Sequence, residues 1–229
     1  YRRQRQMCIR DSYGYVLDTE PVYFDITEEN SSVEGDITVT AVKKSDKAQK
    51  GVIRITKTGE IFSSVTENED VYQPVYTVSG LEGAEFDIIA KEDIYTPDGT
   101  LRYTAGKTAD KIITDKSGAA ASKELYLGKY EVKEIKAPDG MILSKETYDA
   151  ELSYAGQEVE ITEFKTEIYN ERQKAEILIN KALEQDESFG IGMNGEINSV
   201  VFGLYAGEVI TAADGSVIPS DGLLEIAAV

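Results

Sequence analysis

Three polar side chains occupy positions that the strand pattern of the sequence assigns to a buried face. Side chains alternate between the two faces of a β-strand, so residues two apart share an environment. Lys57, Glu134 and Asn170 each lie two residues beyond an apolar residue of an alternating stretch, which is Ile55, Val132 and Ile168 respectively. These stretches would be the first, a late middle and the last strand of one β-sandwich.

Burial of these groups would make them reactive toward one another. A buried charge is costly, and burial moves the pKa of lysine down and that of glutamate up by ~3–5 units. A neutral Lys57 amine is a nucleophile, and a protonated Glu134 can polarise the Asn170 amide and relay protons as ammonia leaves. The expected product is an amide between Lys57 and Asn170. The alternative is that the strand ends fray, leaving a snorkelling lysine, a surface glutamate and a turn asparagine.

The composition excludes several other classes of function. The 229 residues contain 24 Lys plus Arg against 42 Asp plus Glu, a net charge of −18, which disfavours binding to nucleic acid or to anionic membranes. The absence of His and Trp disfavours triad hydrolases, zinc sites and sugar platforms, so we expect no cofactor, no metal and no multiple-turnover enzyme. No apolar run is long enough to span a bilayer. The sequence also gives little support for a glycosidase that uses a pair of carboxylates or for a calcium-binding loop.

The first twelve residues differ from the rest of the chain. Residues 2–12 are basic and read like the translation of a transposase-type sequencing adapter, so we interpret residues 1–12 as an artefact outside the fold. The only cysteine, Cys8, lies in this stretch. A chain without cysteine has no disulfides, so an extracellular location requires another source of stability.

An internal repeat organises the remaining residues. Three pairs of segments align, namely residues 90–106 with 206–222, 49–57 with 173–181, and 14–17 with 140–143. The two copies are offset by 116 residues in the first pair and by 124 in the second. The loop after the lysine is therefore eight residues shorter in the second copy. We therefore predict the end of one domain over residues 13–48, a complete domain over 49–172, and the first half of another over 173–229.

The pattern within the complete copy is typical of an all-β immunoglobulin-like sandwich. Short alternating stretches include residues 53–55, 86–88, 125–127, 130–132 and 164–168. Turns are expected at the Gly-containing segments 97–99, 116–118 and 138–140, the first of them closing a hairpin between residues 94–95 and 101. Only residues 119–124 have any helical character, and they are short enough to be a loop.

Several motifs give this pattern a family resemblance. The relevant strings are Gly51-x-Ile-x-Ile-x-Lys57, Leu81-x-Gly-Ala-Glu-Phe86, Thr114-Asp-x-x-Gly118, Leu127-Gly-Lys-Tyr130-x-Val-x-Glu134-x-Lys-Ala-Pro138-x-Gly140 and Ile168-Tyr-Asn170-Glu171. They resemble the Cna B-type, or SpaA-like prealbumin-fold, domains of Gram-positive surface proteins and pilins. The string from Tyr130 to Gly140 is the most specific of them, although Met141 stands where an aromatic residue is common.

The resemblance implies specific roles for the three polar residues. A lysine of the first strand bonds to Asn or Asp of the last strand in that family, with the glutamate before Ala-Pro as catalyst, which maps onto Lys57, Asn170 and Glu134. Lys181 aligns with Lys57 and would be the corresponding lysine of the next domain. Asp46 aligns with Asn170 and is a candidate acceptor of the preceding one.

The predicted function is a structural one. We expect tandem, self-crosslinked domains in the stalk of an adhesin or pilin-like protein on the Gram-positive cell wall, contacting neighbouring repeats and, through other domains, host matrix or cell-surface ligands. The alternative is that the repeats themselves bind a host protein or glycan through exposed tyrosines such as Tyr95, Tyr103 and Tyr126.

Overall fold

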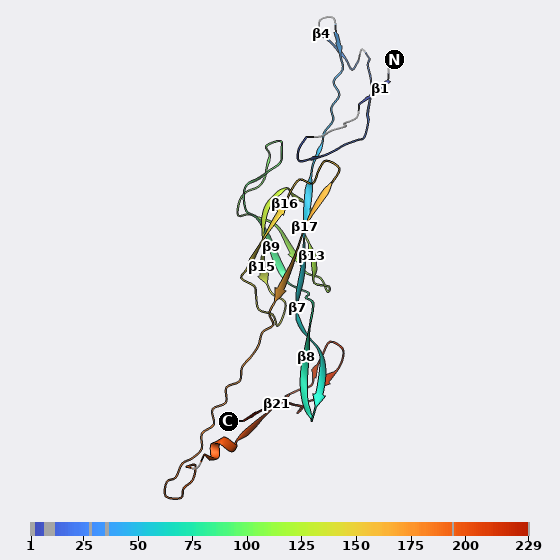
Figure 1. The fold of residues 1–229 in the computed structure, drawn as a ribbon. Helices are drawn as coiled ribbons and strands as arrows, with labels where there is room; N and C mark the ends of the chain where they lie inside the picture. The colour runs from blue at the N-terminus through green and yellow to red at the C-terminus, as the bar shows by residue number, and fades with distance from the viewer. Residues whose placement is uncertain (1–2, 7–11, 28, 35–36, 194, 229) are drawn as a thin grey trace. The chain divides into compact units, whose positions relative to one another are not determined.

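The computed structural model describes residues 3–6, 12–27, 29–34, 37–193 and 195–228 (Figure 1). Its regular structure is β-strand apart from one short 3-10 helix, η1 (Glu196–Ser199), in the described part of the chain. This confirms the predicted all-β class. The chain divides into two compact units, the first made of Tyr1–Lys57, Leu81–Pro138 and Leu143–Ile168, the second of Thr58–Gly80, Asp139–Ile142 and Tyr169–Val229.

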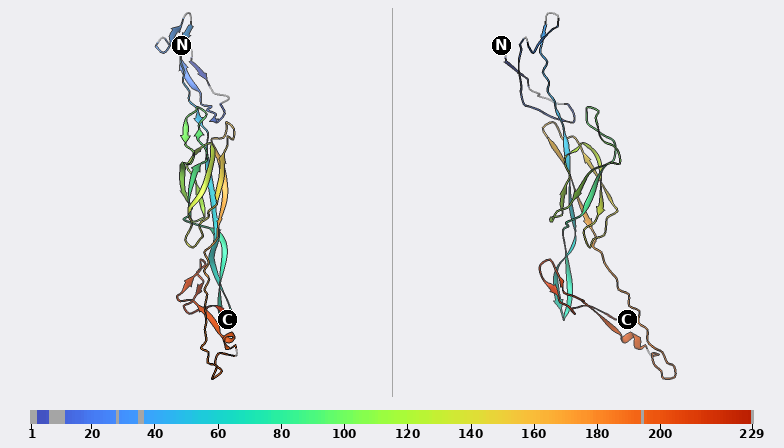
Figure 2. Two further views of the ribbon diagram at one scale, coloured as in Figure 1. Left: turned by 90° about the vertical axis from the view of Figure 1, so that its left-hand side faces the viewer. Right: turned by 180° about the vertical axis from the view of Figure 1, so that it is seen from behind.

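The first unit is built around two layers of strands, which Figure 2 shows from two sides. One layer is an antiparallel sheet in the order β12 (Thr108–Ile113), β9 (Glu85–Ala90), β15 (Gly128–Lys136) and β16 (Thr147–Leu152). In the other layer, β7 (Lys50–Asn68) pairs with β13 (Ala119–Ala121), β14 (Leu125–Tyr126) and β17 (Ile161–Asn170). Residues 119–121 are therefore a strand and not a helical turn.

Alternation of apolar side chains forms the core between these layers. In β9 the inward residues are Phe86, Ile88 and Ala90, and they pair in register with the inward residues Glu134, Val132 and Tyr130 of β15. The three inward residues of β9 are 0% exposed, as is Ile53 of β7. Full burial of a large apolar side chain contributes about 1.5–3 kcal/mol, so this core accounts for the stability of the sandwich.

Short hairpins and two-stranded pairs complete the first unit. The predicted hairpin at Asp98-Gly99 is confirmed as β10 (Ile94–Tyr95) paired with β11 (Leu101–Tyr103). The upstream residues form three pairs: β1 (Arg3–Gln6) with β3 (Val22–Asp25), β2 (Tyr15–Val16) with β6 (Lys47–Ala48), and β4 (Ser32–Glu34) with β5 (Ile37–Val39).

The pairing of β1 differs from what we expected of residues 1–12. The structure pairs Arg3–Gln6 with β3 in an antiparallel register, although we expected this stretch to make no packing interaction. Residues 1–2 and 7–11, and with them Cys8, lie outside the described residues. The adapter interpretation of the stretch stays a prediction.

The second unit contains the outer part of β7, the strand β8 (Val71–Gly80) and the C-terminal residues. The two strands form an antiparallel hairpin from Thr58↔Gly80 to Asn68↔Val71. Glu69 and Asp70 close it with φ of 51° and 63°, the geometry of a tight hairpin turn. The remaining strands are β18 (Val201–Tyr205), β19 (Ile210–Thr211), β20 (Val217–Ile218) and β21 (Leu223–Ala228), with β18 pairing β21 and β19 pairing β20.

One backbone connection occurs at both aligned positions of the repeat. The Gln49 N–H donates to the Gly14 carbonyl at 2.9 Å in the first unit, and the Gln173 N–H donates to the Gly140 carbonyl at 2.8 Å in the second. The glycines of both pairs have positive φ, 86° and 77°, which favours glycine at these turns. The predicted domain boundaries stay a prediction, which this recurrence supports.

Candidate functional site: a buried lysine and glutamate

Lys57 lies where β7 leaves the sandwich, and its backbone is held from both sides. Its N–H donates to the Gly118 carbonyl at 2.7 Å, and its carbonyl accepts from the Leu81 N–H at 3.0 Å. The side chain points to the same inward face of the strand as those of Ile53 and Ile55, and it is 0% exposed. Lysine is among the residues that are almost never fully buried unless paired, so the position needs a partner.

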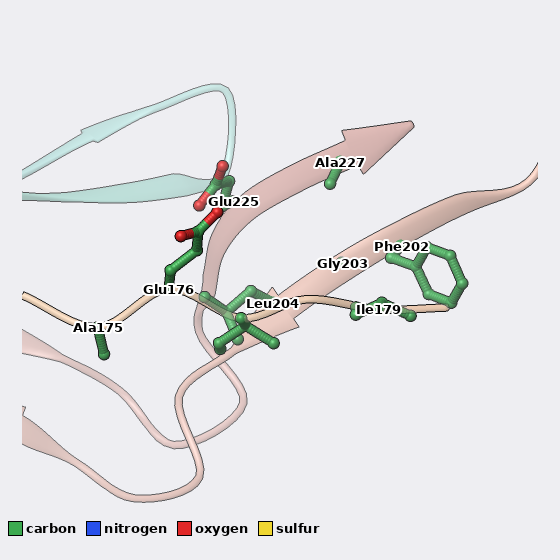
Figure 3. A pocket seen from close by; sticks show the side chains of 9 residues that line it. Ala175, Glu176, Ile179, Phe202, Gly203, Leu204, Glu225 and Ala227 are labelled. Atoms are coloured by element: carbon green, nitrogen blue, oxygen red, sulfur yellow. The ribbon is translucent and has the colours of Figure 1, made fainter. Parts of the chain in front are cut away.

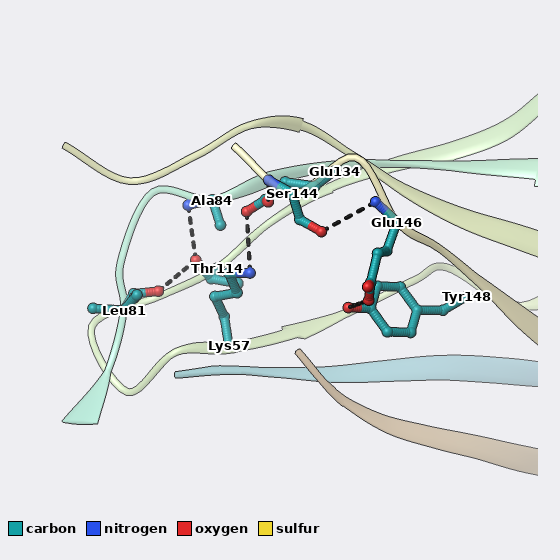
Figure 4. A network of polar contacts seen from close by, with 8 residues as sticks. All are labelled: Lys57, Leu81, Ala84, Thr114, Glu134, Ser144, Glu146 and Tyr148. Carbon is teal, nitrogen blue, oxygen red and sulfur yellow. Dashed lines mark hydrogen bonds and ion pairs between the residues drawn. The ribbon is translucent and has the colours of Figure 1, made fainter. Parts of the chain in front are cut away.

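That partner is Glu134, which β15 presents from the opposite sheet (Figure 4). The Lys57 Nζ lies 3.2 Å from Glu134 Oε1, and both side chains are 0% exposed. The second carboxylate oxygen, Oε2, accepts the Ser144 backbone N–H at 2.9 Å. The carboxyl group is therefore oriented by one fixed donor while its other oxygen faces the amine.

The surroundings act on the Lys57 amine in opposite directions. Burial lowers its pKa below the ordinary value, and the adjacent Glu134 carboxylate raises it, with burial the larger effect. The Phe86 ring, whose centroid is 5.7 Å from Nζ, covers the amine with an apolar group. A lowered pKa increases the neutral, nucleophilic fraction of the amine at a given pH.

Asn170 is the last residue of β17 and is 1% exposed. It has the inward parity of Ile168, which is 0% exposed. Because β17 pairs with β7, the asparagine ends the strand next to the one that carries Lys57. All three predicted site residues are thus buried, and the structure brings Lys57 and Glu134 into direct contact.

Two supports of the site were not predicted as functional. The Thr114 hydroxyl donates to the Leu81 carbonyl at 2.7 Å and accepts the Ala84 N–H at 3.0 Å, which fixes the turn that precedes Phe86 (Figure 4). Thr114 belongs to one of the motifs that carry the family resemblance, so its position was detectable. The Ser144 N–H lies in a loop, and no local sequence pattern marks a backbone donor of this kind.

The two further crosslink candidates lie elsewhere. Asp46 is exposed and directly precedes β6. Lys181 is also exposed and lies outside any strand. Neither has the burial that distinguishes Lys57.

Near Lys181 in sequence, the second unit has a pocket of about 330 Å³ (Figure 3). Its apolar lining includes Ile177, Ile179, Phe202 and Leu204, and the Glu176 and Glu225 side chains lie at one side of it. Phe202 and Leu204 of β18 thus line this pocket together with residues from the segment 175–179, which form no strand.

The tyrosines proposed for ligand binding fall into two groups. Tyr95 is 54% exposed. Tyr103 and Tyr126 are half-buried against the core, with ring centroids 6.2 Å apart. Packing therefore accounts for two of the three.

Two other kinds of site are absent from the described residues. Within them, no group of three or more His, Cys, Asp or Glu side chains is arranged to hold a metal ion. Over the same ranges, no helix has the length and apolar character that a membrane crossing requires.

Part of the chain is similar to known proteins. Residues 75–166 match the SpaA family, described as a prealbumin-like fold domain. The chain is 29% identical over 139 residues to the trypsin-resistant surface T6 protein of Streptococcus pyogenes serotype M6, a match that covers 60% of this chain and 24% of that protein. The chain thus spans about a quarter of the length of this relative.

Similar solved structures include two from Bacillus species. The TIE protein of Bacillus anthracis is 21% identical, with 96% of this chain and 33% of that one covered and a TM-score of 0.42. BcpA, the major pilin subunit of Bacillus cereus, is 23% identical, with 55% and 31% covered and a TM-score of 0.33.

Proposed function

We propose that this chain, whose residues 75–166 match the SpaA prealbumin-like fold domain, is a self-crosslinking structural segment of a Gram-positive surface protein or pilin. In this proposal Lys57 and Asn170 form an isopeptide bond with Glu134 as catalyst. Its support includes the match of residues 75–166 to a prealbumin-like fold domain and the similarity of the chain to a streptococcal surface protein. The location on the cell wall, the adhesin or pilin role and the association with neighbouring repeats belong to the proposal.

The observation that carries the proposal is the fully buried contact between Lys57 and Glu134. Both side chains are 0% exposed and lie 3.2 Å apart. A buried ion pair loses hydration that its attraction recovers only in part, so it is weak support for stability alone. Burial of such a pair beside a strand that ends in a buried asparagine is better explained by a reaction between the groups.

The reaction is balanced without a cofactor. A proton from the Lys57 ammonium passes to Glu134, and the neutral amine attacks Cγ of Asn170. The protonated carboxyl hydrogen-bonds to the amide oxygen as a tetrahedral centre forms, and it then gives its proton to the leaving nitrogen. The Glu134 carboxylate takes the second proton of Nζ as the new amide forms. A Cγ–Nζ bond forms, the Cγ–Nδ2 bond breaks and one ammonia is released.

The covalent bond would stabilise the domain mainly through the unfolded chain. Closing a loop of ~100 residues reduces the entropy of the unfolded state, by analogy with disulfides an effect of roughly 4–5 kcal/mol. Cys8 is the only cysteine of the sequence, so the chain cannot form an internal disulfide. The isopeptide bond would supply the covalent reinforcement that extracellular proteins obtain from disulfides.

The mass of the purified chain tests the proposal. We expect a mass lower than the sequence mass by one ammonia, and one branched Lys57–Asn170 peptide after digestion. Glu134→Gln should abolish both while leaving the sandwich folded, because the amide cannot transfer the protons. Glu131→Gln, on the same strand, is the matched control and should retain the bond. An unshifted mass in folded wild-type protein, or a shifted mass in Glu134→Gln, would contradict the proposal.

A further inference from the structure

The hairpin formed by the outer part of β7 and by β8, residues 58–80, has contacts that the crosslink does not explain. We call it the long hairpin. It lies in the stretch between Lys57 and Phe86, which is eight residues longer than the corresponding stretch between Lys181 and Phe202. In the described residues of that shorter stretch, 182–201, an isolated bridge between Asp186 and Ile191 and the helix η1 stand in place of a long hairpin.

Backbone groups of the long hairpin bind the turn between β19 and β20. The Ala213 N–H donates to the Phe62 carbonyl and the Asp214 N–H to the Ser63 carbonyl, both at 3.1 Å. The Val65 N–H donates to the Ser216 hydroxyl at 2.9 Å. Main-chain groups on one side of the hairpin are therefore satisfied by residues about 150 positions later in the chain.

A second contact lies at the tip of the long hairpin. Val71 of β8 pairs with Leu223 of β21 in parallel. At Gly222 a Cβ atom would lie 3.1 Å from the Tyr72 ring, so the absence of a side chain there allows the close approach. These contacts resemble strand addition, in which main-chain hydrogen bonds supply the binding.

A third contact fixes the chain just beyond β17. The Arg172 guanidinium lies 3.9 Å from the centroid of the Tyr76 ring, and its Nε is 2.9 Å from Glu60 Oε2. Tyr76 itself packs on Phe62, with ring centroids 5.9 Å apart. A stacked and charge-paired arginine is a specific contact that lysine could not replace.

Between Arg172 and β18, the covalent connection is a weak restraint. Residues 173–181 are exposed and outside any strand, with Leu178 81% exposed. A linker of this kind leaves the parts that it joins free to rotate. A second attachment through the long hairpin would remove much of this freedom.

We infer that the long hairpin is a docking arm by which the predicted 49–172 domain holds the following segment of the same chain, residues 201–228. Its partner surface is the β19–β20 turn together with the start of β21. This role goes beyond the proposed crosslink and does not require it. The shorter counterpart after Lys181 would lack such an arm.

Disulfide trapping in the full chain tests the docking, with Cys8→Ser as background. Val71→Cys/Leu223→Cys joins two residues in register, a spacing that suits a disulfide. Val71→Cys/Ile226→Cys is the matched control, because Ile226 is on the same strand and is 58% exposed. We expect the first pair to oxidise at least about tenfold faster, as expected for groups held together. Equal rates for the two pairs would overturn the inference.

Hydrogen exchange gives an independent readout. Replacing residues 62–76 by Asn-Gly shortens the long hairpin, and the Ala213 and Asp214 amides should then lose protection. The Ala212 amide, bonded locally to the Ser216 carbonyl, and the Lys57 amide, bonded to Gly118, report that both parts remain folded. Unchanged protection at Ala213 and Asp214 would contradict docking. The single-ammonia mass deficit is measured separately, so failure of the crosslink and failure of the arm are distinguishable.

Discussion

At the scale of residues, the chemistry of this domain depends on how one amine is buried. Lys57 meets a carboxylate, an aromatic ring and no solvent. Each neighbour has a separate effect, because burial favours the neutral amine while Glu134 favours the charged one. The Ser144 N–H binds Oε2 of this carboxylate, and Oε1 lies next to the amine.

The lowered pKa of Lys57 predicts a pH dependence in a variant that cannot crosslink. In Asn170→Ala the amine stays free, and its pKa in the folded state is below the ordinary 10.5. At pH values between the pKa of Lys57 in the folded state and that in the unfolded state, the unfolded chain binds more protons than the folded chain. The free energy of unfolding should therefore rise with pH in this range. Denaturant titrations up to about pH 10 measure this, because above it tyrosines with raised pKa values, such as Tyr130, act in the opposite direction.

A double variant supplies the control for this pH dependence. Lys57→Met in the Asn170→Ala background removes the titrating amine while keeping a long apolar side chain. Its free energy of unfolding should lack the rise. An equal rise in both variants would assign the effect to other groups.

At the scale of elements, the site depends on turns that lie outside its strands. The turn at Gly118 accepts the Lys57 N–H, and the turn at residues 81–84 both donates to the Lys57 carbonyl and leads into Phe86. The hydroxyl of Thr114, which follows β12, fixes the second of these turns through its bonds to Leu81 and Ala84. The position of the amine is therefore a property of the loops as much as of β7.

Substitution of Thr114 tests this dependence. Thr114→Val keeps the shape but leaves the buried Leu81 carbonyl and Ala84 N–H without the hydroxyl, which should cost about 1–3 kcal/mol of unfolding free energy. The measurement uses the Asn170→Ala background, so that a covalent bond does not obscure the equilibrium. Thr104→Val, at an exposed position, is the control and should have little effect. Equal effects of the two substitutions would show that the hydroxyl is not a specific support.

At the scale of the whole molecule, two devices would act on different parts of the chain. The proposed crosslink closes the sandwich between its first and last strands, and the inferred docking arm restrains residues 201–228. Together they suit a protein that must resist extension. Neither depends on the other, since the arm is bound through backbone groups and Arg172.

Single-molecule pulling measures the proposed effect of the crosslink directly. In the wild-type chain, residues between Lys57 and Asn170 should contribute no extension on unfolding. Glu134→Gln should release roughly 370 Å, at ~3.3 Å per residue. Full extension of the wild-type sandwich would contradict a bond at these positions.

The N-terminal stretch offers a separate prediction. Deletion of residues 1–12 should leave the melting temperature of the sandwich unchanged, because the strand pairing of β1 in the described residues is with β3, among the upstream residues. Thermal unfolding followed by circular dichroism compares the two chains. A marked decrease on deletion would show that these residues belong to the fold.

The all-β class, the main strands and the identity of the buried polar residues could be predicted from the sequence alone. Strand alternation is local, so parity alone is enough to place Lys57, Glu134 and Asn170 on the inward face. The Asp98-Gly99 hairpin was predictable for the same reason, since a turn depends on adjacent residues. The repeat alignment is also a property of the sequence, and its domain boundaries stay a prediction.

Only the tertiary structure decided which groups meet. The contact between Lys57 and Glu134 joins two sheets, and the Ser144 donor comes from a loop, so no local pattern specifies their distances. Residues 119–121 form a strand because they pair with β7, and this pairing overrides their own secondary-structure propensity. The contacts of residues 58–80 with residues 212–223 likewise arise from segments far apart in sequence. Strand parity fixes which way a side chain faces, whereas packing between distant segments fixes the group that it meets.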